Sequence, residues 1–366
     1  MRRLASLAAV LALSACATQQ VSLTGPNAPP GREVSVTSLP GWAQDNEAAA
    51  LTSFVASCKA ILLMPPDSSL GGTGLAQERA GQAGLWQPAC TAAKAVPPNN
   101  EAAAQQFFQT WFNAYQVSGQ ALITGYFEPE VPGSKNQRPG YNVPLYAKPA
   151  TAALANLPRA AIDDGALYRK APVTAYVTSP VDAFMLQIQG SGRIILPDGR
   201  ILRVGFDGQN GQPYTPIGRV LEQMGAIKPD DVSYQSISAW LKAHPADAKS
   251  VMEQNARYVY MRPLGSLPAD EGAPGALGVP LTAERSTAVD RSALPLGAPL
   301  FVSTTDPITG GAINILTVTQ DTGGGIHGPD RADIFFGAGP DAEEIAGSMR
   351  QPGTLYLLLP RSAPES

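Results

Sequence analysis

The residues best suited to catalysis lie in one stretch near the C-terminus, between positions 320 and 337. Asp321 ends an alternating apolar run and is followed by three glycines at 323–325, with Asp330 and Asp333 a little further on. Consecutive glycines allow a backbone or a sugar chain to approach closely. Apolar neighbours and clustered like charges both raise the pKa of a carboxyl above its usual value of about 3.9. Acid cleavage of a glycosidic bond requires such a carboxyl.

A purely structural role explains the same residues, and the spacing alone favours it. In this interpretation Asp321 caps a turn, and Asp330 or Asp333 pairs with Arg331. A calcium loop is less consistent with the pattern, because the alternating Asp and Asn ligands of an EF-hand are absent from the sequence.

Other catalytic classes lack the residues that they require. With Cys16 lipidated, two histidines, His244 and His327, and two cysteines remain, which nearly excludes a zinc site that needs three or four such ligands. No serine stands in a nucleophile-elbow context. No phosphate-binding glycine loop with a lysine follows a predicted strand. We therefore expect no metal and no cofactor. His327, in the glycine-rich loop, stays a candidate substrate contact.

The N-terminus predicts export and lipidation. Arg2 and Arg3 precede an apolar stretch at 4–13 that is too short to span a bilayer. Small residues before Cys16 form the pattern of a lipoprotein cleavage box, although an ordinary secretory signal with an incidental cysteine is the alternative. We expect a signal peptide at 1–15, then a lipidated Cys16 and a flexible tether over 16–42.

Charge and the remaining cysteines restrict the partners and the compartment. Removing two arginines with the signal leaves 24 of 26 basic residues against 30 acidic ones, a net charge of −6. An acidic chain of this kind is a poor candidate for binding nucleic acid. Cys58 and Cys90 predict either one disulfide in an oxidising compartment or two buried thiols.

The elements that position the acidic stretch are mostly short strands. Apolar spacing predicts helices from near Asp45 or Asn46 to 62 and over 101–115, where an aromatic stripe fits core packing better than a sugar site. From 121 onwards, Gly and Pro turns separate short alternating runs, which favours small β-barrels. The expected strands are 121–128, 141–147, 184–189, 193–196, 201–206, 258–262, 299–302, 312–320, 333–337 and 354–359. Helices are expected at 216–224 and 236–244, and a surface loop at 264–281.

Several separated blocks of the sequence resemble one known family. These blocks are Thr124-Gly125-Tyr126-Phe127-Glu128-Pro129, then Gln187 to Gly192 with the glycine-rich 198–218, and finally Gln320-Asp321-Thr322-Gly323-Gly324 through Asp330, Asp333 and Gly337. In this order, behind a lipoprotein box, they resemble the membrane-bound lytic murein transglycosylase A (MltA) family. The last block is similar to the "3D" domain named for three aspartates. The resemblance covers about residue 51 to the C-terminus.

The resemblance implies a mainly β, α+β architecture with two domains. A double-psi β-barrel would comprise the helical residues 43–123 and the C-terminal residues 256–366. A second β-barrel would be inserted between them at 124–255. A groove between the two would hold a glycan strand.

The resemblance also implies a reaction and its residues. The family cleaves the β-1,4 bond between N-acetylmuramic acid and N-acetylglucosamine and forms a 1,6-anhydro ring, with one aspartate, here Asp321, as acid and then base. Asp330 and Asp333 would assist Asp321. The expected sugar contacts are Thr124, Tyr126, Glu128, Gln187, Gln189 and Ser191, for each of which barrel packing is an equal alternative.

Two rival functions and the cellular location complete the expectations. One rival is a glycoside hydrolase that uses two carboxylates. The other is a lipoprotein that binds peptidoglycan without cleaving it. Ala17 gives no inner-membrane retention signal of the Asp type, so we expect a lipid anchor on the periplasmic face of the outer membrane. The expected partner is the peptidoglycan glycan strand, and the sequence names no protein partner.

Overall fold

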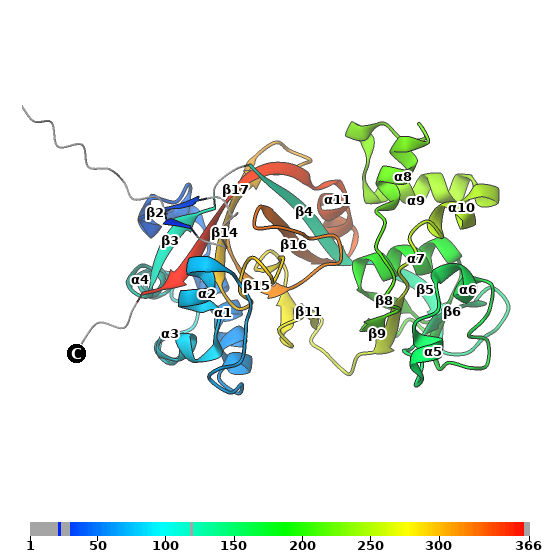
Figure 1. Cartoon of the computed structure of the whole chain (residues 1–366), viewed down its shortest axis with the longest axis horizontal. Coiled ribbons are helices and arrows are strands. Elements are labelled where there is room, and N and C mark those ends of the chain that lie inside the picture. The colour runs from blue at the N-terminus through cyan, green and yellow to red at the C-terminus, as the bar shows by residue number, and fades with distance from the viewer. Residues whose placement is uncertain (1–20, 23–29, 118–119, 362–366) are drawn as a thin grey trace, which may run out of the picture.

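The computed structural model describes residues 21–22, 30–117 and 120–361. It has two lobes side by side along the long axis, and β4 (Ala121–Glu128) runs from one towards the other (Figure 1). Cys16 and the expected signal peptide lie outside the described residues. Within the described ranges, no helix has the length and apolar character needed to cross a membrane.

The first lobe is built on a sheet whose inner strands close into a ring. The sheet has nine strands in the order β1-β2-β3-β17-β14-β15-β13-β16-β4, and β17 also pairs with β4. Strands β17, β14, β15, β13, β16 and β4 therefore form a closed barrel with parallel pairs β13–β15 and β16–β4. The strands are β1 (Val21–Ser22), β2 (Pro30–Val34), β3 (Phe112–Gln116), β13 (Ser286–Ala288), β14 (Pro299–Thr305), β15 (Ala312–Asp321), β16 (Arg331–Ala338) and β17 (Arg350–Pro360).

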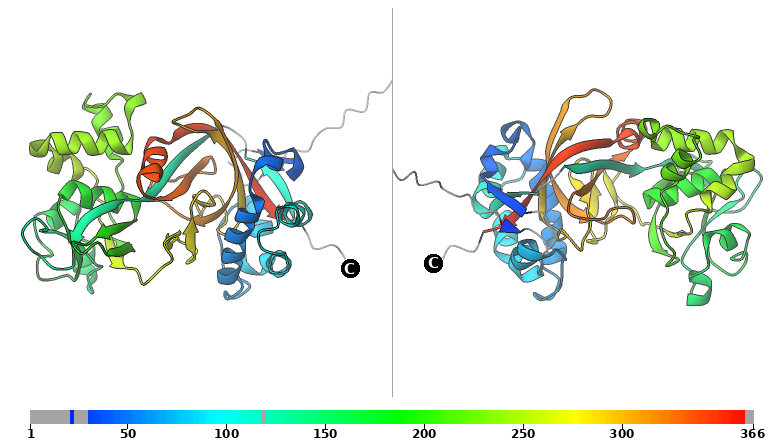
Figure 2. Two further views of the ribbon diagram at one scale, coloured as in Figure 1. Left: turned by 180° about the vertical axis from the view of Figure 1, so that it is seen from behind. Right: turned by 45° about the horizontal axis from the view of Figure 1, so that its top comes forward.

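Helices cover two sides of this barrel. Most of them lie at the end of the molecule away from the second lobe, whereas α11 lies between the barrel and that lobe (Figure 2). They are α1 (Glu47–Ile61), α2 (Gly74–Ala80), α3 (Gln87–Ala93), α4 (Glu101–Trp111) and α11 (Pro340–Ser348), with 3-10 turns at Val36–Ser38, Trp42–Gln44 and Ala83–Trp86. A disulfide joins Cys58 of α1 to Cys90 of α3.

Two expectations for the N-terminal region are corrected. The helix expected over 101–115 ends at Trp111, because Phe112 begins β3, which pairs with β17. The tether expected to reach residue 42 is folded from Pro30 onwards: β2 pairs with β3, and Val36, Leu39 and Trp42 are buried in the core. A run dominated by Ser, Pro and Gly hides these three apolar residues, which recur every third position.

The second lobe is a curled six-stranded sheet with its own helices. The strand order is β10-β9-β8-β5-β7-β6, and β10 also contacts β6, so the sheet closes on itself around an apolar core. The strands are β5 (Glu130–Ser134), β6 (Val143–Tyr146), β7 (Val173–Val177), β8 (Ser191–Ile195), β9 (Ile201–Gln209) and β10 (Val259–Pro263). The helices are α5 (Ala152–Ala155), α6 (Arg159–Asp163), α7 (Pro180–Gln189), α8 (Ile217–Gln223), α9 (Tyr234–Ala243) and α10 (Pro245–Met252), with a 3-10 turn at Pro229–Asp231.

The strand expected at 184–189 is wrong, because these residues belong to α7. Ser179 caps this helix by accepting from Val181 and Asp182, and Pro180 stands in its first turn, where proline is favoured. The apolar run of 184–188 is buried on several sides of the helix, so the sequence lacks helical periodicity there. The expected hairpin between β8 and β9 is confirmed.

Two chain crossings join the lobes, and a buried carboxylate fixes both. Glu128, at the end of β4, is fully buried and binds the guanidinium groups of Arg193 and Arg203 at 3.0 and 2.9 Å. Its Oε1 also accepts from the N–H of Ala273, in the return crossing. That crossing was expected to be a surface loop over 264–281, but it contains β11 (Glu271–Pro274) and β12 (Pro280–Thr282), which pair with each other.

Candidate active site

Strand register places four side chains in one row across the barrel sheet. Ala288 of β13 pairs with Asp321 of β15 on one side and with Asp333 of β16 on the other, and Asp333 pairs with Thr124 of β4. Paired residues on neighbouring strands point to the same face of a sheet. The small side chain of Ala288 therefore separates two carboxylates that face the same way. The fold thus brings together Asp321 and Asp333, as expected, with Thr124 beside them.

Asp321 is half-buried and has a hydrogen bond on each oxygen. The N–H of Ala276 donates to Oδ1 at 2.9 Å, and the hydroxyl of Tyr126 donates to Oδ2 at 3.0 Å. Burial raises the pKa of Asp321 above its ordinary value, while hydrogen bonds from the backbone of Thr322 and from these two donors lower it. The pKa of Asp321 is therefore raised, yet its carboxylate form still accepts hydrogen bonds from Ala276 and Tyr126.

Tyr126 is suited to be a permanent donor to Asp321. Its ring is buried against Phe335, with the ring centroids 5.2 Å apart. Burial, and then the charges of Asp321 and Asp333, raise the pKa of the Tyr126 hydroxyl well above its usual range. The hydroxyl therefore stays protonated near neutral pH and remains a hydrogen-bond donor to Asp321.

Asp333 is the second carboxyl of the row. The hydroxyl of Thr124 donates to its Oδ1 at 2.7 Å. Burial raises the pKa of Asp333 to about 6, the Thr124 bond and the charge of Arg331 lower it, and the charge of Asp321 raises it. Asp333 is thus charged for most of the range above pH 6 and adds negative potential near Asp321.

A polar clamp holds the strand immediately before Asp321. Gln320 is fully buried, and its amide nitrogen donates to the Ser53 carbonyl at 3.0 Å and to the Ser57 hydroxyl at 2.8 Å. Its amide oxygen accepts from the hydroxyls of Ser53 and Ser286. A satisfied buried network of this kind fixes one geometry. Helix α1 therefore determines where β15 ends and where Asp321 points.

Asp330 is not part of the row. Its side chain is exposed, and its backbone carbonyl accepts from the N–H of Leu122 at 2.9 Å. The loop that ends at Asp330 is instead held by Asp290, whose Oδ2 accepts from the N–H of Gly328 at 2.8 Å. His327, the other polar candidate of this loop, is exposed.

The expected sugar contacts from the second lobe differ in their availability. Gln187 is buried, and its Oε1 accepts from Nη2 of Arg159 at 2.7 Å. Ser191 is buried, and Glu128 is occupied by the two arginines. Gln189 is only partly buried and accepts from the N–H of Phe127 at 3.0 Å through its side-chain oxygen, which leaves its amide nitrogen available.

Two residues of the second lobe face the glycine run that follows Asp321. A Cβ on Gly324 would overlap Nη1 of Arg257, and one on Gly325 would lie 3.1 Å from Cε1 of Tyr214. In this conformation the Arg257 guanidinium fills the space that a side chain at position 324 would take. Tyr214 lies in a block that carries the family resemblance, but nothing in the sequence around Arg257 marks it.

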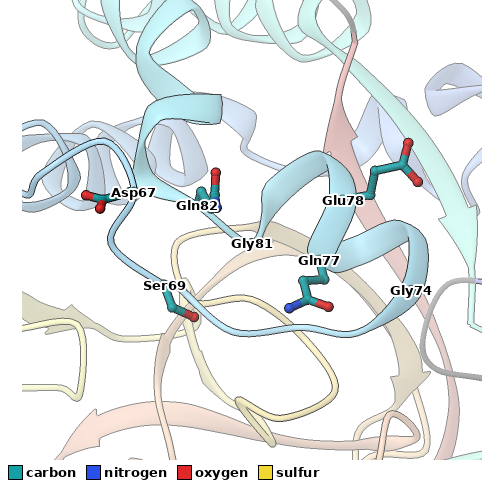
Figure 3. Close-up of a pocket in the computed structure, with 7 residues that line it drawn as sticks. All are labelled: Asp67, Ser69, Gly74, Gln77, Glu78, Gly81 and Gln82. Atoms are coloured by element: carbon teal, nitrogen blue, oxygen red, sulfur yellow. The ribbon is translucent and has the colours of Figure 1, made fainter.

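Two polar pockets of the described surface lie away from this row of carboxylates. A polar pocket of about 410 Å³ lies beside α2, and its labelled side chains do not converge, since Asp67 and Glu78 point away from each other (Figure 3). A second pocket, of about 600 Å³, is lined by residues around Asp231 and Arg350. Neither is lined by any residue of the row.

Comparisons with known proteins define the class of this two-domain arrangement. The family model described as "MltA specific insert domain" matches residues 122–262, and the "3D domain" model matches residues 285–359. The first range covers the barrel strand β4 and nearly all of the second lobe, and the second covers the part of the barrel that carries Asp321 and Asp333. Membrane-bound lytic murein transglycosylase A of Escherichia coli (strain K12) is 34% identical over 248 residues, which are 66% of this chain and 66% of that protein. The match thus spans just under two thirds of that relative's length.

Solved structures extend the likeness to nearly the whole chain. The membrane-bound lytic murein transglycosylase from Agrobacterium tumefaciens superposes with a TM-score of 0.80 at 30% identity, covering 90% of this chain and 97% of that one. E. coli MltA with bound chitohexaose gives a TM-score of 0.67 at 26% identity, covering 94% and 96%. The chain belongs to the lytic murein transglycosylase A family of enzymes, which confirms the resemblance and the two-domain α+β fold.

Proposed function

We propose that this protein cleaves the β-1,4 bond between N-acetylmuramic acid and N-acetylglucosamine in peptidoglycan and leaves a 1,6-anhydromuramoyl end. The observation that carries the proposal is Asp321 itself: a half-buried carboxyl with a raised pKa, next to a glycine run that a sugar chain can approach. The structure of E. coli MltA with bound chitohexaose supports a glycan as the ligand.

One carboxyl is sufficient for this reaction. Asp321, protonated, gives its proton to the glycosidic oxygen as the bond from that oxygen to C1 of the muramic acid breaks. The resulting carboxylate then takes the proton of the C6 hydroxyl of the same sugar, while the C6 oxygen bonds to C1 and closes the anhydro ring. Asp321 ends protonated again, and no water is consumed. The two bonded donors, Ala276 and Tyr126, stabilise the carboxylate between the two steps.

Asp333 then has an electrostatic role. Its charge opposes ionisation of nearby carboxyls, and its bond from Thr124 keeps it in the row. In a two-carboxylate hydrolase, Asp333 would instead activate water for attack on C1. The engagement of its Oδ1 by Thr124 favours the electrostatic role. Asp330, exposed at the end of the loop, would act only on the loop conformation.

The expected sugar contacts divide into two groups. Gln189, with an uncommitted amide nitrogen, is the best candidate for a hydrogen bond to the glycan. Thr124 and Tyr126 act through the two carboxylates. Glu128, Gln187 and Ser191 are buried, so we assign them to holding the wall of the second lobe.

We further propose that the mature protein is anchored by a lipid on Cys16 at the periplasmic face of the outer membrane. The names of the relatives describe membrane-bound enzymes. The domain boundaries are also part of this proposal, with the barrel at 43–123 plus 256–366 and the insert at 124–255. We note that β10 extends the second sheet to Pro263.

Digestion of purified sacculi tests the reaction. The soluble protein, lacking residues 1–16, should release muropeptides one water lighter than hydrolytic products, as read by mass spectrometry. Asp321→Asn should abolish the release, whereas Asp230→Asn, at an exposed site of the second lobe, should not. Products of full hydrolytic mass would establish the two-carboxylate hydrolase. Binding to sacculi without any release by the wild type would leave only a peptidoglycan-binding lipoprotein.

A further inference from the structure

Arg257 is a half-buried cation without a counter-charge. The most buried arginines of the described chain each have a carboxylate partner: Arg159 with Asp163, Arg193 and Arg203 with Glu128, and Arg285 with Asp45. Arg257 forms no ion pair with any described residue; its Nε donates to the Gln212 carbonyl at 3.0 Å, and its guanidinium lies 5.9 Å from the ring centre of Tyr214. Arg79 and Arg331 are also half-buried without an ion pair to a described residue, but a nitrogen at the end of each donates to a neutral group, the Tyr115 hydroxyl and the Leu122 carbonyl. The end of the Arg257 guanidinium has no such partner among the described residues and is therefore available to an anionic ligand.

The backbone of Arg257 is fixed, so its side chain starts from a defined point. Its N–H donates to Oδ1 of Asn255 at 3.3 Å, and its carbonyl accepts from Nη2 of the buried Arg159 at 2.8 Å. The Nε bond to Gln212 then holds the guanidinium plane, while neither Nη has a hydrogen-bond partner among the described residues. The two free Nη groups can therefore donate a pair of hydrogen bonds to a planar anion such as a carboxylate, with little loss of conformational entropy.

That free edge lies against the glycine run that follows Asp321. Nη1 occupies the space over Gly324, three residues after Asp321, and the neighbouring Tyr214 ring lies over Gly325. The charge of Asp333 also reaches the Tyr214 hydroxyl, whose pKa it raises after burial. A glycan that extends from Asp321 along the glycine run would therefore meet Arg257.

The substrate itself provides the missing anion. The sugar rings of peptidoglycan are uncharged, but each muramic acid carries a lactyl group on O3 that ends in a carboxylate, or in a peptide that carries carboxylates. We propose that Arg257 binds a carboxylate of this O3 substituent and so distinguishes muramic acid from N-acetylglucosamine next to the scissile bond. This inference rests on the proposed function.

Binding of three ligands to the non-cleaving Asp321→Asn protein tests the inference. The ligands are chitohexaose, which has no carboxylate; peptide-free murein oligosaccharide, with the lactyl carboxylate; and the same chain bearing its peptides. Adding Arg257→Gln should raise the Kd of at least one carboxylate-bearing ligand about tenfold, the value of one charge-assisted bidentate contact, and leave that of chitohexaose unchanged. A loss for the peptide-free chain identifies the lactyl carboxylate, and a loss for the peptide-bearing chain alone identifies the peptide.

Two controls keep this result separate from other effects. Arg262→Gln removes the same charge from an exposed position of β10 and should change none of the three Kd values. Arg257→Lys should recover part of the lost affinity, because it restores the charge without the bidentate geometry. An equal loss for chitohexaose, or no loss for any ligand, would overturn the inference. Failure of the Asp321→Asn protein to bind any of the three would instead count against the proposed function.

Discussion

Replacing Tyr126 by Phe tests whether the environment of Asp321 sets the working pH. The substitution removes the only side-chain hydrogen bond that a described residue makes to Asp321 and leaves the buried ring against Phe335 in place. Because that bond lowers the pKa of Asp321, its loss should raise the pKa further. A hydrogen bond to a charged group contributes about 1.5–3 kcal/mol, and one pKa unit corresponds to about 1.4 kcal/mol, so we expect a rise of about one unit.

The sign of the effect on activity follows from the role of Asp321 as an acid. The rate should fall as pH rises through the pKa of Asp321 in the folded enzyme, so the alkaline limb of the pH–rate profile should move upward by about one unit in Tyr126→Phe. Initial rates of muropeptide release from sacculi between pH 4 and 9 measure this limb. Tyr168→Phe, at a tyrosine that is 58% exposed, is the matched control and should not move it. An unchanged or lowered alkaline limb in Tyr126→Phe would refute the reasoning.

Three other substitutions have expected outcomes. Glu128→Gln removes the counter-charge of the buried Arg203 and leaves Arg193 with Glu130 alone, so urea denaturation should show a loss of about 3 kcal/mol in the free energy of unfolding; a loss under about 1 kcal/mol would contradict the ion-pair network. Thr124→Val should raise the pKa of Asp333 above about 6 in a carboxyl NMR titration, and a fall would show that this bond does not favour the charged form. Burial, and then the neighbouring Glu101, raise the pKa of Glu47 from 4.5 to about 8 in the folded protein. Protonated Glu47 therefore contributes stability that is fully present below pH 4.5 and is lost as pH rises through 8. Glu47→Gln stays neutral, so it should melt above the wild type at pH 9 and near it at pH 4, and parallel melting curves across pH would contradict this.

The local patterns of the sequence predicted most of the barrel strands. Apolar and polar residues alternate in runs such as 121–128 and 312–320 because one face of each strand is buried. The bounds of β4 and β15 agree closely with these runs. Of the two cap candidates for the first helix, Asn46 caps α1 through its side chain, and Asn100 caps α4 in the same way. These features depend on residues within a few positions of each other.

Features set by distant contacts could not be predicted in this way. The aromatic run beyond Trp111 reads as helix, yet Phe112 pairs with Pro360 at the other end of the chain. The segment 264–281 reads as an exposed loop, yet the N–H of Ala276 donates to Asp321 and that of Ala273 to Glu128. A backbone donor leaves no trace in the residue type, so no sequence pattern could have indicated Ala276.

The candidate site contains residues that local sequence patterns indicate and residues that only distant contacts bring to it. The sequence marks the carboxylates, because their types and the glycines beside them are unusual. It does not mark Arg257, which lies between a helix and a strand with no flanking motif. The barrel alone supplies Asp321, Asp333 and their donors, which are sufficient for proton transfer. The positive group of the barrel, Arg331, lowers the pKa of Asp333 and donates to the Leu122 carbonyl, whereas the insert places the guanidinium of Arg257 over Gly324. If the barrel provides the chemistry and the insert the recognition, substitutions in the row should change the rate at saturating substrate. Arg257→Gln should then change the affinity for the glycan and leave the rate at saturating substrate unchanged.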